Sequence, residues 1–469
     1  MNSSIKHLLV YVSAVALLTC VLPGRVCAQT GANPYVIVAD ATSDSDRGLA
    51  LQAAYNQAKT MSPSAANRIT VLIPPGGYYF WGHCFTVDTP YIDLIGMVPV
   101  QMTMRIKTNI VIAGVSTVVE MTVAKPEPQG GLRLYSSGGT YVGVITQTAS
   151  HVRIANMVLS SLASGPTNMN DAAGDEPAAY WPAAGLQDVT IEHVYFDHSN
   201  CFSMSYMGDY PGVYRDCVAG DGSFGMGFDT TGAASGSFQD CVAGDFSFGA
   251  EDMVFGGSGN FDHCTGGYDS FGGGGLATGH FAHCIGGYGS FGGDGGASSG
   301  LFEDCYAQDF SFGGSSVFSP TPGVYKNCVG GNYSFGEYGP LKGRFEFCRG
   351  GAVSFSGSQA IDPSAVLVHC FGGANSFGQY NTSSTDFNYV GTTSDTVSSI
   401  NLHGQTINNG VFNGNGAGLV GVPGSAITGA VHVPGNIQTD GQFVGNGSAL
   451  LISQQGDLSM GPFTAGPHP

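Results

Sequence analysis

Eight cysteines between residues 217 and 370 recur every 20 to 24 residues, and each stands in the same short frame. An aromatic residue, or leucine in the last copy, precedes the cysteine by three positions; alanine or glycine follows it by two; serine and phenylalanine follow it by six and seven. The cysteines are Cys217, Cys241, Cys264, Cys284, Cys305, Cys328, Cys348 and Cys370. Fixed spacing within a copy and variable spacing between copies is typical of a solenoid in which one repeat makes one coil.

Glycine content decides between helical and strand-built coils. Glycine is 74 of the 469 residues, and each glycine inside a helix costs about 1 kcal/mol relative to alanine. Short strands joined by tight turns accommodate this composition, and three of them make a coil of about 22 residues. Parallel coils stack about 4.8 Å apart, so the repeat predicts interior rows of phenylalanine over phenylalanine and cysteine over cysteine. We expect these thiols to be buried and free, because stacking holds them too far apart for disulfides.

The same frame continues toward the N-terminus with less regular residues. Ile191, Val194 and Cys201 take the aromatic, cysteine and phenylalanine positions, and Ile154 and Met157 take the first two positions of an earlier coil. The segments "YIDLIGM" (91–97) and "NIVIAGV" (109–115) are interpreted as further coils. Residues 91–390 are therefore predicted to form the solenoid.

Residues 29–90 are predicted to cap its first coil, because an open end would expose strand edges and apolar core. Residues 44–61 form an amphipathic helix in this prediction, with Asp44 or Asp46 as its cap and Leu51, Ala54, Tyr55 and Ala58 on one apolar stripe. The segment "ITVLIPPGGYYF" (69–80) follows as the first strand and turn.

These features resemble the right-handed parallel β-helix proteins of the pectate-lyase-like superfamily. The resemblance lies in the predicted helix followed by "VLIPPGGYYF" and in the "FxDC" coils, and it covers residues 35–390. It implies an all-β, single-stranded right-handed parallel β-helix with an N-terminal capping helix. It leaves the activity open, because the superfamily contains lyases, hydrolases, epimerases, phage tailspikes and adhesins.

The two ends of the chain differ from the solenoid. Residues 1–28 are typical of a signal peptide, with Lys6 before an apolar run and small residues at the cleavage site, and they predict a secreted, extracellular or cell-surface protein. The Gly-rich tail, 391–469, contains two "FxGNG" segments (412–416 and 443–447) that resemble repeats of phage tail fibres and bacterial surface proteins. This resemblance implies a bacterial or phage-derived protein and a homotrimer formed through the tail.

The charge of the chain restricts its partners. The net charge is −19, and no lysine or arginine occurs between Arg215 and Lys326. Nucleic acid is excluded as a partner, because binding phosphate backbones depends on Lys and Arg displacing counterions. No segment after the signal is apolar and long enough for a membrane span.

The position directly before each cysteine is rich in Asp and His. A column of such residues at coil spacing could hold a metal or bind sugar hydroxyls, whereas in related β-helices it is a bend where Asn, Asp and His tolerate left-handed backbone. We favour the bend and predict no metal site and no cofactor. Calcium binding stays open, although "FGGDGGASSG" (291–300) lacks the nonapeptide register of calcium-binding β-rolls.

One irregular segment, 165–185, interrupts the early coils. It contains Asp171, Asp175, Glu176, Tyr180 and Trp181. Carboxylates beside exposed aromatic rings suit a sugar, and loops on a rigid scaffold often carry function. These five residues are the predicted carbohydrate-binding site; the alternative is a loop that packs Trp181 onto the coils.

Two functions follow. The first is a structural or binding protein that holds a polysaccharide or cell-surface glycan; the second is a polysaccharide lyase or glycoside hydrolase that works in a groove along the coils. A hydrolase needs two carboxylates flanking one bond, and the chain has "RIK" at 105–107 without the carboxylate motifs that precede it in β-helix hydrolases. A lyase needs cations, for which Arg105, Lys107, Arg133 and Arg153 are candidates unless they are solvated surface charges. The sequence favours binding and assigns no catalytic residue.

Overall fold

The structure is a computed structural model, and all the residues it describes belong to the first of two compact units, Met1–Gly410 and Val411–Pro469. The described residues are 34–128, 130–137, 144–161, 179–183, 185–197, 212–225, 234–249, 256–293, 297–313, 323–336, 341–355, 362, 364–373 and 376–377. The signal segment, Cys201 and the tail lie outside them, so the predictions for these parts stay predictions.

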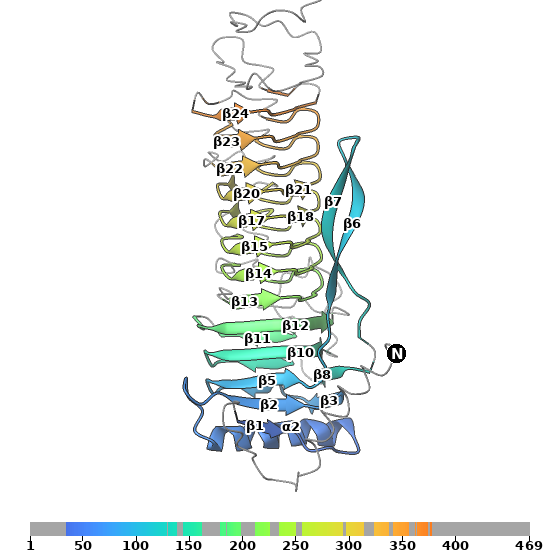
Figure 1. Ribbon diagram of the computed structural model, residues 1–469, viewed down its shortest axis with the longest axis vertical. Coiled ribbons are helices and arrows are strands. Elements are labelled where there is room, and N and C mark those ends of the chain that lie inside the picture. Colours follow the sequence, from blue (N-terminus) through green and yellow to red (C-terminus); the bar gives the residue numbers. More distant parts are fainter. Residues whose placement is uncertain are drawn as a thin grey trace, which may run out of the picture. The chain divides into compact units, whose positions relative to one another are not determined.

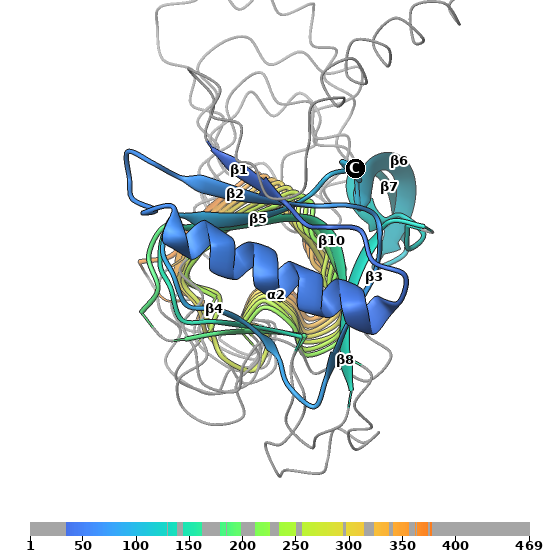
Figure 2. The ribbon, with the colours of Figure 1, turned by 90° about the horizontal axis from the view of Figure 1, so that it is seen from below.

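Helix α2 (Asp44–Thr60) covers one end of the coils, as the sequence predicts (Figure 2). The N-cap is Ser43 and not Asp44 or Asp46 as predicted, because the Ser43 hydroxyl accepts a hydrogen bond from the backbone N–H of Asp46 at 3.1 Å. Its buried face contains Leu51, Ala54 and Ala58, together with Tyr55. The Tyr55 hydroxyl accepts hydrogen bonds from the backbone N–H groups of residues 88 and 89 at 3.0 and 3.1 Å, which ties the helix to the coil that it covers.

A 15-stranded parallel sheet runs along the coils, and its main path takes the strands in chain order, one from each successive coil (Figure 1). This is the predicted single-stranded right-handed parallel β-helix. The main path is β1 (Tyr35–Ile37), β2 (Ile69–Ile73), β5 (Ile92–Gly96), β10 (Val152–Ser161), β12 (Val189–Asp197), β13 (Gly212–Arg215), β14 (Ser237–Gln239), β15 (Asn260–Asp262), β17 (His280–Ala282), β20 (Leu301–Glu303), β22 (Gly323–Lys326), β23 (Gly343–Glu346) and β24 (Val366–Val368).

Two further strands, β3 (Gly76–Trp81) and β8 (Leu132–Ser137), extend this sheet beside β10. Shorter parallel pairings complete the other sides of the coils. They join β4 (Phe85–Val87), β9 (Ile145–Gln147) and β11 (Tyr180–Pro182); β16 (Leu276–Ala277) and β19 (Ala297–Ser298); and β18 (Ile285–Gly286) and β21 (Tyr306–Ala307).

Two rows of stacked aromatic rings fill the interior of the repeat coils. Rings from Tyr214 to Phe345 stack with centroids 4.6–5.0 Å apart. Rings from Phe224 to Phe377 stack at 4.7–5.0 Å. The two rows meet edge to face, an arrangement that suits the quadrupoles of the rings. The predicted ladders are therefore confirmed.

The cysteine row is buried, and all eight thiols are free, as predicted. Most of these thiols donate to a carbonyl of the preceding coil; the Cys305 sulfur lies 3.3 Å from the Phe281 oxygen. Burial raises the pKa of Cys217, Cys264 and Cys328 well above the ordinary value of a thiol. These cysteines therefore act as small apolar residues.

The glycine that follows five of the eight cysteines by two positions makes room for the serine row. A Cβ on Gly286 would lie 2.5 Å from the Ser290 Cβ. The serines connect successive coils, because the Ser354 N–H donates to the Ser376 hydroxyl at 3.0 Å and the Ser354 hydroxyl donates to the Gly331 carbonyl at 3.2 Å.

The position before each cysteine is a left-handed bend. All eight residues there have φ between 49° and 55°, from Asp216 to His369. Asn, Asp and His adopt this conformation more readily than other non-glycine residues, so the predicted bend is confirmed. Phe347 is the exception in residue type, and its ring stacks on His369 at 4.7 Å.

The earlier coils agree with the frame in part. Ile154 pairs with Ile191, Ile191 with Tyr214, and Met157 with Val194, as predicted. Segment 91–97 contains β5, also as predicted. The interpretation of 109–115 as a coil was wrong, because these residues form the tip of an antiparallel hairpin.

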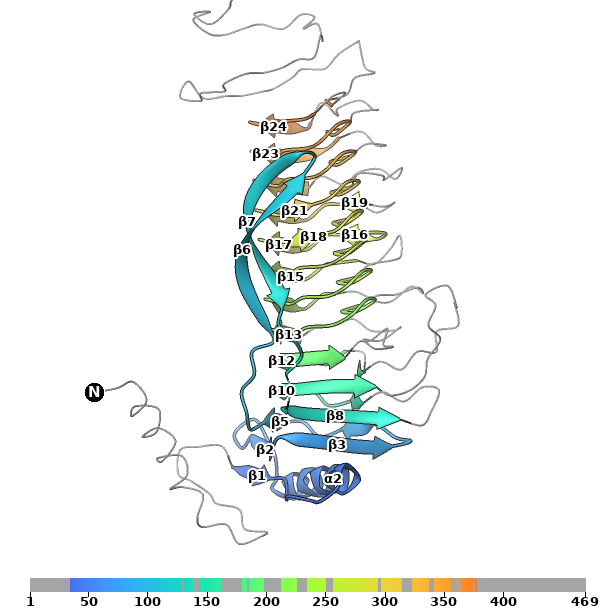
Figure 3. The ribbon, with the colours of Figure 1, turned by 90° about the vertical axis from the view of Figure 1, so that its right-hand side faces the viewer.

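That hairpin consists of β6 (Thr103–Ile112) and β7 (Val115–Ala124), joined by a two-residue turn at Ala113 and Gly114 with φ of 50° and 77°. Positive φ at both turn residues gives the tight connection that matches strand twist. The hairpin lies lengthwise against later coils (Figure 3). At one end Thr103 contacts Asp216, and at its tip the Ala113 methyl lies beside Gly351, where a Cβ would come within 2.7 Å.

Among the described residues, no helix has both the length and the apolar character that crossing a bilayer requires.

Candidate functional site

The predicted carbohydrate-binding segment is described only at its C-terminal end. Asp171, Asp175 and Glu176 lie outside the described residues, so their role stays a prediction. Tyr180 and Trp181 lie on β11. The Tyr180 side chain is buried, and its hydroxyl donates to the Gln147 side chain at 2.7 Å. Its ring therefore belongs to the core and is not offered to a ligand, whereas Trp181 is half-buried.

Two aspartates of the bend column hold the hairpin, Asp216 and Asp240. The Asp216 carboxylate accepts hydrogen bonds from the backbone N–H groups of Met102 and Thr103 at 2.9 and 2.6 Å, from the Thr103 hydroxyl and from His193 Nδ1. Burial works to raise the pKa of Asp216, but the hydrogen bonds from His193 and Thr103 outweigh it and hold that pKa below its usual value. Asp216 is thus a buried anchor, ionised at neutral pH.

The next coil repeats the contact with a different partner. Arg105 of the hairpin donates to both Asp240 oxygens, at 2.6 and 3.0 Å, and this raises the pKa of Arg105. Two other cations considered for a lyase are also paired, Arg153 with Glu192 and Arg133 with Glu127. None of these three arginines is therefore an uncommitted cation for neutralising a uronate.

The hydrogen bond from His193 to Asp216 predicts a pH-dependent contribution to stability. It raises the pKa of His193 above the unfolded value, so its stabilisation is complete below about pH 6.5 and is lost as the pH rises through the folded pKa. We expect His193→Asn to cost more at pH 6 than at pH 9, by less than about 1 kcal/mol because the imidazole is partly exposed. Urea unfolding of both proteins at the two pH values measures this; an equal cost at both would contradict it.

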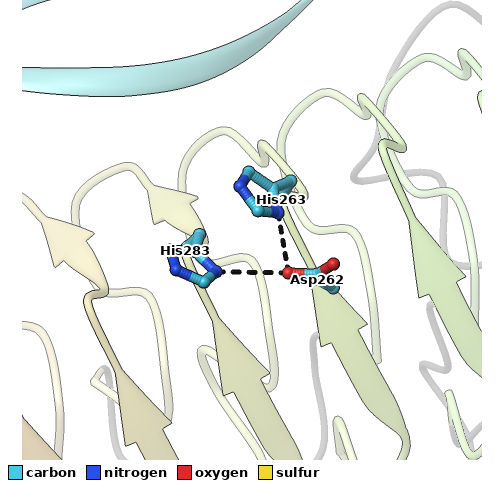
Figure 4. Close-up of side chains that lie close together, drawn as sticks. All are labelled: Asp262, His263 and His283. Carbon is cyan, nitrogen blue, oxygen red and sulfur yellow. Dashed lines mark hydrogen bonds and ion pairs between the residues drawn. The ribbon is translucent and has the colours of Figure 1, made fainter.

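Farther along the column, His263 and His283 form a cluster with Asp262, the last residue of β15 (Figure 4). Asp262 Oδ1 lies 2.7 Å from His263 Nδ1 and 3.2 Å from His283 Nδ1. The two imidazoles stack with centroids 4.3 Å apart. Sequence reasoning identified the two histidines as column members but not Asp262, which ends β15 one position earlier; consecutive "FDHC" and "FAHC" copies are the signal that could have found it.

Three aromatic side chains form a group on β3 and β8, near the capping helix; Trp81 is exposed, and Tyr79 and Tyr135 are half-buried. Strand alternation buries Tyr78 and Phe80 and turns Tyr79 and Trp81 outward, so that Trp81 is 72% exposed. The Tyr79 ring meets the Trp81 ring edge to face at 5.8 Å and lies 5.0 Å from Tyr135. The sequence interpretation treated 69–80 only as the first strand and missed this surface, although the alternation in "GGYYFW" is a signal for it.

Polar groups adjoin these rings. The Tyr135 hydroxyl donates to the Asp44 carboxylate, which also accepts from Arg47 at 3.2 Å. Burial and the Asp44 carboxylate raise the pKa of Tyr135 to about 12, so it stays a hydrogen-bond donor at neutral pH. We call Tyr79, Trp81, Tyr135, Asp44 and Arg47 the aromatic platform.

Comparisons with known proteins do not identify a family. No family model and no curated protein sequence matches the chain. Among solved structures, pectin methylesterase PemA from Erwinia chrysanthemi matches with a TM-score of 0.20 and 12% identity, over 68% of this chain and 75% of that chain. At this TM-score the match carries no weight, and the assignment of the β-helix depends on the strand pairing and the stacked rows.

Proposed function

We propose that this chain is an exported β-helix protein that binds a polysaccharide or cell-surface glycan on its N-terminal coils without cleaving it. The observation that carries the proposal is the exposure of Trp81. The interior rings of the repeat coils are buried in stacked rows, yet neither of the chain's two tryptophans, Trp81 and Trp181, is fully buried. An exposed indole beside two further aromatic side chains is an apolar surface on which a partner can stack.

The aromatic platform has the chemistry of a sugar-binding surface. A sugar presents an apolar C–H face and a rim of hydroxyls, and the platform offers ring faces together with a carboxylate, a guanidinium and a phenol. Edge-to-face contact with Tyr79 leaves a face of Trp81 open to a ligand. Placement on paired strands rather than on a loop keeps the rings preorganised, which lowers the entropy cost of binding.

Binding is favoured over cleavage because the platform contains a single carboxylate, that of Asp44. Glycosidic hydrolysis uses two carboxylates on either side of one bond, whereas Asp44 is occupied by Arg47 and Tyr135. The platform by itself therefore lacks the pair of carboxylates that a hydrolase needs.

Replacing Trp81 by alanine tests the proposal. The full-length protein is titrated with a panel of soluble uronate and neutral polysaccharides, and we expect the best-bound member to bind Trp81→Ala roughly tenfold or more weakly. Leu49→Ala is the control, because Leu49 is 69% exposed on α2 and its loss removes apolar surface without a ring.

The same samples are assayed for new reducing ends and for absorbance at 235 nm. Equal affinity of Trp81→Ala and the unaltered protein would contradict binding at the platform. Release of unsaturated or reducing products, abolished by Asp175→Ala or Glu176→Ala, would replace the proposal with the enzymatic alternative.

A further inference from the structure

We propose that Asp262, His263 and His283 bind a zinc ion on the outer bend of two successive coils. Two imidazole nitrogens and one carboxylate oxygen are a ligand set that zinc uses widely, with water in an open position. The proposal is independent of the aromatic platform and adds a further role to a column that forms the bend and, at Asp216 and Asp240, holds the hairpin.

The distances among the three side chains fit a shared ion. With Zn–N near 2.0–2.1 Å and Zn–O near 2.0–2.2 Å, tetrahedral ligand atoms lie about 3.3 Å from one another. The Asp262 Oδ1 distances to His263 and His283 Nδ1 are 2.7 and 3.2 Å, and one ligand atom from each residue can be chosen so that all lie within 4.8 Å of one another. The two imidazole planes are stacked only 17° apart, so both rings must turn about their side-chain torsions for their nitrogens to converge on one ion.

The backbone places the ligands in a fixed arrangement. His263 and His283 have φ of 53° and 54°, so the repeat gives their imidazoles the same direction one coil apart. Each bend is held by its own backbone hydrogen bond to the following coil, His263 N–H to the Ala282 carbonyl and His283 N–H to the Glu303 carbonyl, both at 2.9 Å. Asp262 pairs with Ala282 on the next coil, where a small side chain leaves space beside its carboxylate.

Neighbouring charges support a cation. His283 Nε2 lies 4.0 Å from Asp304 Oδ2 on the following coil, which suits a carboxylate that orients a metal-binding imidazole through its second nitrogen. Arg105 is a cation close enough to Asp262 to interact with it electrostatically. Its guanidinium, however, forms two hydrogen bonds with Asp240. Asp262 and His283 are 46% and 48% exposed along their side chains, so an ion can enter from solvent.

The nature of the ligands selects the metal. Imidazole nitrogen suits zinc and related transition metals, whereas calcium takes six to eight oxygen ligands. The sequence leaves calcium binding open, but these ligands do not suit calcium, so any calcium would bind elsewhere. A bound zinc would connect the coil of β15 to that of β17 and stabilise the native state in proportion to its concentration.

Calorimetric titration with zinc chloride tests the site. The untagged full-length protein is used in a Cys84→Ser background, which removes the half-buried thiol beside His83 as a competing ligand. We expect one zinc per chain, and at least tenfold weaker binding after His263→Asn or His283→Asn. Asparagine preserves the bend, since Asn327 has φ of 54° at the same position. Asp304→Asn should weaken binding about tenfold through the orientation of His283.

His280→Asn is the matched control, because His280 lies on β17 three residues away and contacts Glu303 instead of the cluster. Its zinc affinity should equal that of the parent protein, and circular dichroism and urea midpoints confirm that each variant folds. The absence of zinc binding at 100 µM, or equal affinity in the His263→Asn and parent proteins, would overturn the proposal. A raised urea midpoint with zinc in the parent, absent in the two histidine variants, would support it without reference to heat signals.

Discussion

Phe281→Ala is expected to lower the free energy of unfolding by about 3–5 kcal/mol, the usual cost of deleting a buried phenylalanine. Phe281 is fully buried. Its ring stacks on Phe261 and Phe302 at 4.8 and 4.9 Å and meets the second row edge to face at Phe271 and Phe291. Removing it takes away all four ring contacts and leaves a cavity between coils that cannot collapse, because main-chain hydrogen bonds fix the coil spacing.

Urea unfolding of the full-length protein, followed by circular dichroism, measures this loss. Phe371→Ala is the control, because Phe371 is 43% exposed outside the two rows and should cost less than about 1 kcal/mol. Hydrogen exchange locates the effect: in a solenoid each coil contacts only its neighbours, so protection should fall mainly in the coils of β15, β17 and β20. A cost as small as that of Phe371→Ala would mean that the stacked row contributes little to stability.

Much of the fold could be predicted because equivalent residues of each repeat occupy equivalent environments in successive coils. A residue that recurs at one position of each copy must lie over its equivalents once the coils stack, which is why the rows through Phe281, Cys284 and Phe291 followed from spacing alone. The bend followed in the same way, since Asp, Asn and His share a tolerance for positive φ at the position before the cysteine.

The hairpin β6–β7 could not be predicted by this reasoning. Its strands alternate like any half-buried strand, so segment 109–115 looked like another coil. The hairpin differs from a coil strand in its contacts with Asp216 and Asp240, which follow it by more than a hundred residues. Such long-range contacts cannot be predicted from the local sequence. The turn residues Ala113 and Gly114 were the one local sign of a hairpin.

The candidate sites show the same limit. Column reasoning grouped His263 with His283 but left out Asp262, because Asp262 lies one position before the bend and belongs to a different column. Trp81 was overlooked because a first strand next to a cap is expected to be structural. Tyr180 was proposed as a ligand contact because segment 165–185 gathers carboxylates and aromatic residues. The pairing of β11 with β9 instead directs its side chain into the core.

Asp216→Ala is expected to detach the base of the hairpin and to lower the free energy of unfolding by roughly 3–5 kcal/mol. The carboxylate is the acceptor for the Met102 and Thr103 backbone N–H groups and the Thr103 hydroxyl, and both residues are almost fully buried. Alanine would leave these donors without that acceptor, in a place that water reaches poorly. Hydrogen exchange across 103–124 should rise strongly while the interior coils keep their protection.

Asp240→Ala is the matched control, because it changes the same residue type at the same bend, with φ of 52° against 49° for Asp216. Any backbone strain of alanine at positive φ is then common to both variants and cancels in their difference. Asp240 loses a partly exposed pair with Arg105, which should cost about 1 kcal/mol or less. If Asp216→Ala lowers the free energy of unfolding by at least 2 kcal/mol more than Asp240→Ala does, the buried Asp216 carboxylate is the main attachment of the hairpin. Equal costs, or unchanged exchange across 103–124, would mean instead that the apolar contacts along the hairpin hold it against the coils.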